Sequence, residues 1–132
     1  MCNAAGQLDR LMTDDYKTCL EIICNFPTIY RTGDKRPVDI VRQSGYLDIY
    51  QHLTEDKIAI HINNNRGLVE TWLTFSEDIR HSPAWGFQTL DKSWTVFYMD
   101  NGKIKKEFTF DNSADACAKM IKMTMDEIRK SV

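Results

Sequence analysis

Four pairs of adjacent carboxylates are the most conspicuous groups in this sequence that could do acid–base chemistry. They are Asp14/Asp15, Glu55/Asp56, Glu77/Asp78 and Asp126/Glu127. Adjacent side chains point in different directions on helices and strands, so no pair is a ready acid–base dyad. Each pair falls at an expected helix end or in an expected loop. We therefore interpret them as solvated carboxylates.

The cysteines and histidines could form a metal site or a nucleophilic site. They are Cys2, Cys19, Cys24 and Cys117, with His52, His61 and His81. None of the spacings matches a zinc site, and the dispersed glycines form no phosphate-binding loop. We expect no cofactor, no metal and no enzymatic activity. One alternative remains: an enzyme whose site is assembled from Asp39, His61 and Cys117, since such groups meet in space rather than in sequence.

The composition of the 132 residues limits the class of protein. The formal charge is −2, 42% of the residues are hydrophobic and 27% are charged. These values exclude collagen-like, disordered and disulfide-scaffold chains, and they disfavour a strongly basic nucleic-acid binder. No apolar run is long enough to span a bilayer, and the first residues do not resemble a secretory signal. We expect a single cytoplasmic domain over residues 1–132.

The first half of the chain has helical periodicity. Apolar residues between 8 and 23 recur every three or four positions, which predicts a helix that ends before Pro27. Pro37 suits the first turn of a short helix that ends before Gly45. Thr54 suits the N-cap of a third helix. We expect residues 1–66 to be helical.

Four strands are predicted over residues 67–110. They cover residues 68–75, 84–90, 94–99 and 103–110, and Asn101-Gly102 predicts a type I′ hairpin turn between the last two. Short connections favour an antiparallel meander. The predicted fold is therefore α+β, with a four-stranded antiparallel meander sheet packed against the N-terminal helices and one C-terminal helix over residues 112–130.

The C-terminal helix is expected to start at an Asp-Asn-Ser cap over residues 111–113. Its apolar stripe would be buried. Its basic residues would form a solvated face; these are Lys119, Lys122, Arg129 and Lys130.

The charges are unevenly distributed. Residues 67–115 contain eight acidic and five basic residues, whereas residues 116–132 contain two acidic and four basic residues. All three tryptophans lie in the acidic segment. Strict alternation in the predicted strand 68–75 places Trp72 on a polar face beside Glu70, which suggests a protein-binding patch. The alternative is that a helix covers Trp72.

The second half of the chain resembles the small immunity proteins of bacterial contact-dependent growth-inhibition and related polymorphic toxin systems. The resemblance covers about residues 67–128. It lies in Trp85-Gly86-Phe87-Gln88, Trp94-Thr95-Val96-Phe97-Tyr98, the Asp100-Asn101-Gly102 turn, and Phe108-Thr109-Phe110 leading to Ala114-Asp115-Ala116-Cys117.

This resemblance implies a cytoplasmic protein that binds and neutralises the C-terminal toxin domain of a large secreted protein. Such toxins are often nucleases with basic active sites, and a ribonuclease is the favoured type. An acidic surface suits such a partner, and we expect contact through Glu70, Trp72, Glu77, Asp78 and Glu107. No membrane and no direct nucleic-acid partner is expected. The alternative function is a small α+β domain that binds single-stranded nucleic acid on its sheet.

Overall fold

The computed structural model describes residues 16–78 and 84–132. Cys2, His81, the Asp14/Asp15 pair and the start of the predicted first helix lie outside these residues. The described part begins with a helix over residues 16–24. Along the chain this helix is followed by α2 (Phe26–Arg31), α3 (Pro37–Ser44), α4 (Tyr46–Ile49), α5 (Glu55–Asn63), α6 (Gly67–Asp78), β1 (Ala84–Leu90), β2 (Ser93–Asp100), β3 (Lys103–Phe110) and α7 (Ser113–Arg129).

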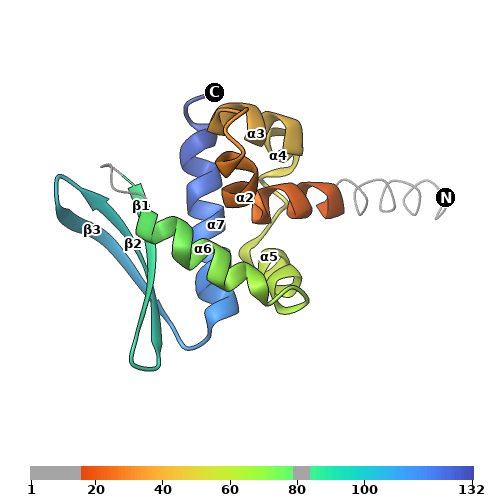
Figure 1. Ribbon diagram of the computed structural model, residues 1–132. Helices are drawn as coiled ribbons and strands as arrows, with labels where there is room; N and C mark the ends of the chain where they lie inside the picture. Colours follow the sequence, from red (N-terminus) through yellow and green to blue (C-terminus); the bar gives the residue numbers. More distant parts are fainter. Residues whose placement is uncertain (1–15, 79–83) are drawn as a thin grey trace.

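Helix α7 is the central element of the fold. The three strands lie on one side of it and the N-terminal helices on the other (Figure 1). It contacts α3, α5 and α6 as well as all three strands. Its buried residues therefore lie on more than one face, and many of them are small: Ser113, Ala114, Ala116, Cys117, Ala118, Met120, Ile121 and Met125.

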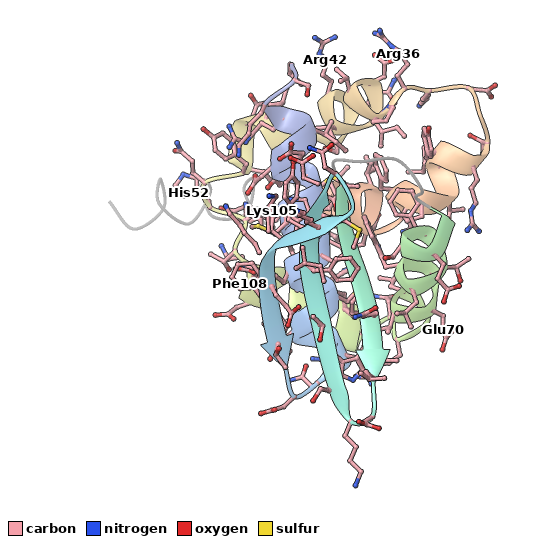
Figure 2. The ribbon with its side chains drawn as sticks, turned by 90° about the vertical axis from the view of Figure 1, so that its left-hand side faces the viewer. Arg36, Arg42, His52, Glu70, Lys105 and Phe108 are labelled. Carbon is pink, nitrogen blue, oxygen red and sulfur yellow. The ribbon has the colours of Figure 1, made fainter. Side chains whose placement is uncertain are left out.

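The sheet is an antiparallel meander in the order β1-β2-β3. Its inner face is turned to α7 and carries a layer of aromatic rings, including Trp85 and Phe108, whose ring centroids are 6.2 Å apart. Its outer face carries Phe97, which pairs with Gly86 on one side and Glu107 on the other. A Cβ atom at Gly86 would lie 2.4 Å from Cζ of Phe97, so only glycine leaves room for this ring. Figure 2 looks onto this outer face, with α7 behind the sheet.

The sequence prediction of four strands is wrong, because residues 67–78 form helix α6. Both the two-residue period of a strand and the 3.6-residue period of a helix fit this stretch, and the buried residues decide between them. Leu68, Val69, Trp72 and Phe75 are buried, a spacing that only a helix places on one face. The predicted alternation had put Trp72 opposite Phe75, whereas their rings meet edge to face at 5.4 Å. The α+β class and the last three strands are confirmed.

The predicted local signals are confirmed where they concern turns and caps. Asn101 and Gly102 both have positive φ, 54° and 75°, as a type I′ turn requires. The Thr54 hydroxyl accepts a hydrogen bond from the Lys57 amide at the start of α5. The Asn112 side chain accepts one from the Asp115 amide at the start of α7. No helix in the described residues has both the length and the apolar character needed to cross a membrane.

Trp72 connects α6 to the helical half of the molecule. Its side chain is fully buried, its ring stacks on Phe26 with centroids 6.2 Å apart, and its indole N–H donates to the Cys24 carbonyl at 2.9 Å. The Ser76 hydroxyl accepts from the Phe87 amide at 2.7 Å, which joins α6 to β1. The helix is therefore fixed on two sides.

We predict that Trp72→Ala lowers the free energy of unfolding by about 3–5 kcal/mol, because it leaves a large cavity and removes the hydrogen bond to Cys24. Ile60→Ala is the control, since Ile60 is 62% exposed, and its effect should stay within about 0.5 kcal/mol. Urea unfolding of both variants measures the difference. Equal stability of the two variants would contradict the packing of Trp72 between Phe26 and Cys24.

Candidate functional site

Helix α6 carries four of the five residues predicted to contact a partner, all except Glu107. Glu70 and Glu77 are exposed, and together with Thr74 they follow the i, i+4, i+7 spacing of one helix face. We name these three residues the acidic stripe. Asp78 is the last residue of the helix. The stripe lies opposite the buried face that contains Trp72, so the prediction that Trp72 lies on a polar face beside Glu70, open to a partner, is wrong.

Glu107 lies apart from the acidic stripe. It is exposed on β3 and pairs with Phe97 of β2, whereas α6 packs beside β1 at the other edge of the sheet. Glu70 points away from the strands in Figure 2. The structure therefore brings Glu70 and Glu77 together and leaves Glu107 at a separate position.

In the structure, the net negative charge that the sequence had assigned to the sheet lies on α6. Residues 84–111, which contain the three strands, have four acidic and four basic residues and are neutral. Residues 67–78 have three acidic residues and no basic residue. The negative charge of this part of the chain thus belongs to α6, and the sheet has no net charge.

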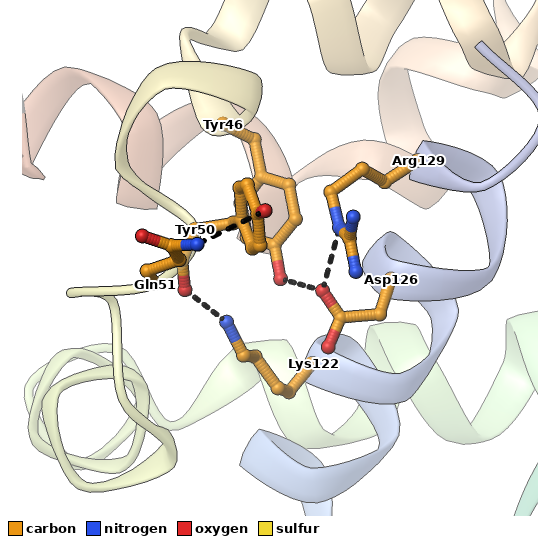
Figure 3. A network of polar contacts seen from close by, with 6 residues as sticks. All are labelled: Tyr46, Tyr50, Gln51, Lys122, Asp126 and Arg129. Atoms are coloured by element: carbon orange, nitrogen blue, oxygen red, sulfur yellow. Dashed lines mark hydrogen bonds and ion pairs between the residues drawn. The ribbon is translucent and has the colours of Figure 1, made fainter.

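A polar network joins α7 to α4 and the residues that follow it (Figure 3). The hydroxyl of the buried Tyr46 donates to Oδ1 of Asp126 at 2.6 Å. Nε of Arg129 lies 3.5 Å from the same oxygen, and its guanidinium lies 4.0 Å above the Tyr50 ring. Burial and the Asp126 carboxylate raise the pKa of Tyr46, so the hydroxyl stays protonated and serves as a donor.

Three basic side chains of α7 are held against aromatic rings or carbonyls, which corrects the prediction that they form a solvated face. Lys119 lies over Phe108 at 4.2 Å and pairs with Glu55 at 3.3 Å. Nζ of Lys122 donates to the Tyr50 carbonyl at 2.6 Å, and burial lowers the pKa of this lysine. The third is Arg129, whose guanidinium covers the Tyr50 ring. Lys130 alone of the four is exposed as predicted.

Beside this network, a pocket of about 400 Å³ opens between the sheet and the last turns of α7; we name it the sheet pocket. Trp85 and Tyr98 form its aromatic wall. Its charged groups have both signs, with Asp126 and Glu127 against three basic residues, which are Lys106, Arg129 and Lys130. These mixed charges do not select a ligand of one sign.

A second pocket, of about 480 Å³, lies between the helix over residues 16–24, α5 and the start of α6; we name it the helical pocket. Its lining contains three asparagines, His61, one carboxylate and one ammonium group. Burial lowers the pKa of His61, and the Glu21 carboxylate opposes this effect. The imidazole is therefore neutral at pH 7 and keeps one nitrogen as an acceptor.

The scattered residues Asp39, His61 and Cys117 do not form a catalytic site. The Asp39 carboxylate pairs with Arg36 at 3.1 Å, and His61 lines the helical pocket. Cys117 is fully buried, and burial raises the pKa of its thiol, with Cys24 nearby. A buried thiol with a raised pKa is a poor nucleophile. Among residues 16–78 and 84–132, no group of three potential metal ligands lies close enough to hold an ion.

Sequence reasoning missed the polar network and both pockets. Tyr46 and Asp126 are 80 positions apart, and no local pattern pairs them. The one signal available was Asp126 itself, a carboxylate next to the apolar stripe of α7, which requires a partner if it is buried.

Comparison with models of protein families, with curated proteins and with solved structures found no match to this chain.

We predict that Tyr46→Phe lowers the free energy of unfolding at pH 7 by about 1–3 kcal/mol, because Asp126 loses its buried donor. The same change should also make the free energy of unfolding decrease less steeply at alkaline pH. The pKa of Tyr46 is higher in the folded chain than the value of 10.0 expected when unfolded. The unfolded chain therefore releases this proton first, and stability falls as the pH rises above 10.

The buried thiols, like Tyr46, make the folded protein less stable as the pH rises. Burial raises the pKa of Cys19 to about 11 and that of Cys24 to about 12, from 9.0. The Tyr46→Phe variant should consequently still lose some stability at alkaline pH. Lys122 opposes the loss, since its pKa is lowered on folding. Urea unfolding under reducing conditions at pH 7 and at about pH 10.5 measures the change. An unaltered slope with pH would contradict the assignment to Tyr46.

Proposed function

We propose that this protein is a non-enzymatic, cytoplasmic immunity protein. It binds and neutralises the C-terminal toxin domain of a contact-dependent growth-inhibition system. The partner is a basic nuclease domain, with a ribonuclease favoured. The observation that carries the proposal is the acidic stripe on α6, a helix with no basic residue, fixed to the body of the molecule by its opposite face.

The acidic stripe suits a basic partner for electrostatic reasons. Nucleases hold phosphate with Lys, Arg and His side chains, and carboxylates at matching positions can occupy those side chains in place of phosphate. Complementary charge accelerates association and excludes partners of the same sign. The contact residues of the proposal are Glu70, Glu77 and Asp78. Glu107 lies on the neighbouring sheet and is outside the main contact.

Trp72 has a positioning role in this proposal. It holds α6 through its contacts with Phe26 and Cys24, so the two exposed glutamates keep their spacing without a partner. A contact surface that is already ordered loses little conformational entropy when it binds.

The resemblance to immunity proteins is a second support. The residues that carry it form one continuous unit, in which β1, β2 and β3 follow each other in a meander and the chain continues directly into α7. The strand, turn, strand and helix expected for this segment are all present.

The proposal predicts that a large secreted protein is encoded next to this chain, and the first experiment is co-expression with the C-terminal domain of that protein. We predict that the wild-type protein restores growth and co-purifies with the toxin domain. Growth arrest in cells that contain soluble, folded protein would overturn the proposal.

We predict that Glu70→Lys with Glu77→Lys weakens binding of the toxin domain by about tenfold to a hundredfold, mainly through slower association. Asp34→Lys with Asp48→Lys is the matched control. Both of these aspartates are exposed on the α3–α4 side of the molecule, and the change in net charge is the same. Association rates at low and high salt measure the effect. Equal losses in both double variants would indicate attraction by net charge alone and would contradict contact through α6.

One observation favours nucleic-acid binding as a second candidate function. Phe97 is half-buried on the outer face of the sheet, and β3 next to it carries three of the chain's lysines. We predict no salt-dependent binding of a labelled single-stranded oligonucleotide, because one ring on a neutral sheet gives a weak stacking platform. Fluorescence anisotropy tests this. Binding that weakens with salt and is lost in Phe97→Ala would favour the second candidate.

A further inference from the structure

The helical pocket is formed by two helical rows that face each other. Lys17, Glu21 and Asn25 follow at intervals of four along the first row, and His61, Asn65 and Leu68 form the second. Nζ of Lys57 lies 4.3 Å above the ring of Tyr16, which packs the first helix against α5. Both the helix over residues 16–24 and α5 end beside the pocket. The C-terminal end of a helix carries partial negative charge, so both ends favour a cation.

The two asparagines that flank the pocket have their amide nitrogens already occupied. Nδ2 of Asn25 donates to the Glu21 carbonyl at 2.7 Å, and Nδ2 of Asn65 donates to the His61 carbonyl at 2.9 Å. A carbonyl oxygen only accepts, so the nitrogen must face it and the orientation of each amide is fixed by chemistry. In the part of the chain that the structure describes, neither Oδ1 atom has a donor. Both oxygens are therefore available as acceptors.

The charged groups of the pocket are one carboxylate and one ammonium. Glu21 adds two acceptor oxygens, and its charge acts on His61 across the pocket. Lys17 is the competing cation, on an exposed side chain. Leu68 adds an apolar wall. The fixed polar atoms are thus acceptors from two separate helical rows, with an apolar surface beside them.

We infer that the helical pocket binds a guanidinium group. A guanidinium is planar, carries five N–H donors in a fixed arrangement and is weakly hydrated, so it can reach acceptors on both rows and lay its flat face on Leu68. An ammonium group has three donors around one atom and is more strongly hydrated. The pocket should therefore prefer arginine over lysine.

The guanidinium can come from an arginine side chain of a protein partner or from a free guanidino compound. The first source rests on the proposed function. The pocket adjoins the start of α6, the helix that carries the acidic stripe on its opposite face. A basic toxin domain that contacts the stripe and reaches around the start of α6 could place an arginine in the pocket.

The test is an NMR titration of the full chain with Nα-acetyl-argininamide, with Nα-acetyl-lysinamide as the matched probe. We predict that backbone amide shifts change around Glu21, Asn25, His61 and Asn65, and that the arginine probe binds about tenfold more tightly than the lysine probe. Absence of localised shifts, or equal binding of the two probes, would overturn the inference.

Two variants sharpen this titration. Glu21→Gln keeps the shape of the side chain and should weaken binding of the arginine probe at least about threefold, whereas Lys17→Ala removes the competing cation and should not weaken it. Glu107→Gln is the control for loss of one carboxylate. If Glu21→Gln and Glu107→Gln have the same effect, the pocket is not the site.

Binding of the toxin domain distinguishes the two sources of the guanidinium group, a side chain of the partner and a free guanidino compound. Weaker toxin binding by Glu21→Gln identifies a side chain of the partner as the ligand. Arginine-probe binding together with unaltered toxin binding by Glu21→Gln identifies a free guanidino compound. Probe binding by a chain that fails to bind the toxin domain would refute the proposed function and leave the guanidinium site intact.

Discussion

The burial of α7 on nearly all sides is the constraint on which the rest of the structure depends. A sheet covers one side of the helix, and α3, α5 and α6 cover the other. Such close approach requires small side chains, and the first two turns supply Ala114, Ala116 and Ala118. The basic residues of the helix cannot all reach open solvent. Their apolar stems are buried and their charges rest on aromatic rings or carbonyls, as for Lys119 and Lys122.

The same constraint explains the polar network around Asp126. A carboxylate on an enclosed helix costs free energy unless donors meet it, and Asp126 receives the Tyr46 hydroxyl and the Arg129 guanidinium. Tyr46 comes from α4, a helix of only four residues that lies directly after the left-handed Gly45. The pairing thus joins two distant parts of the chain and fixes the short helix to the long one.

How far the sequence could predict the fold depended on whether a signal was local. The Asn101-Gly102 turn, the caps at Thr54 and Asn112 and the last three strands all rest on neighbouring residues, and they were predicted correctly. Residues 67–78 carry both a period-2 and a helical pattern over one short stretch. The choice depends on Phe26 and Cys24, far away in the sequence, which bury Trp72. The predicted position of Trp72 on a polar face failed for the same reason. Glu70 and Glu77 are exposed, and their contact with a partner stays a prediction.

This correction changes the electrostatic basis of the proposed function. With residues 68–75 in the predicted strand, Glu70 would belong to the same sheet as the lysines of β3, and Glu77 and Asp78 would lie in the connection to the next strand. As a helix, the segment separates its charges from the sheet and places Glu70 and Glu77 two turns apart on one exposed face. The helical pocket, at the start of the same helix, adds free acceptors and Glu21, whereas the sheet pocket has more basic than acidic groups. In the complex that we propose, the partner contacts the acidic stripe on the exposed face of α6 and reaches around the start of the helix to the helical pocket. Because α6 is fixed by Trp72 and Ser76, the distance between these surfaces is set before the partner arrives, which favours one orientation of binding over the others.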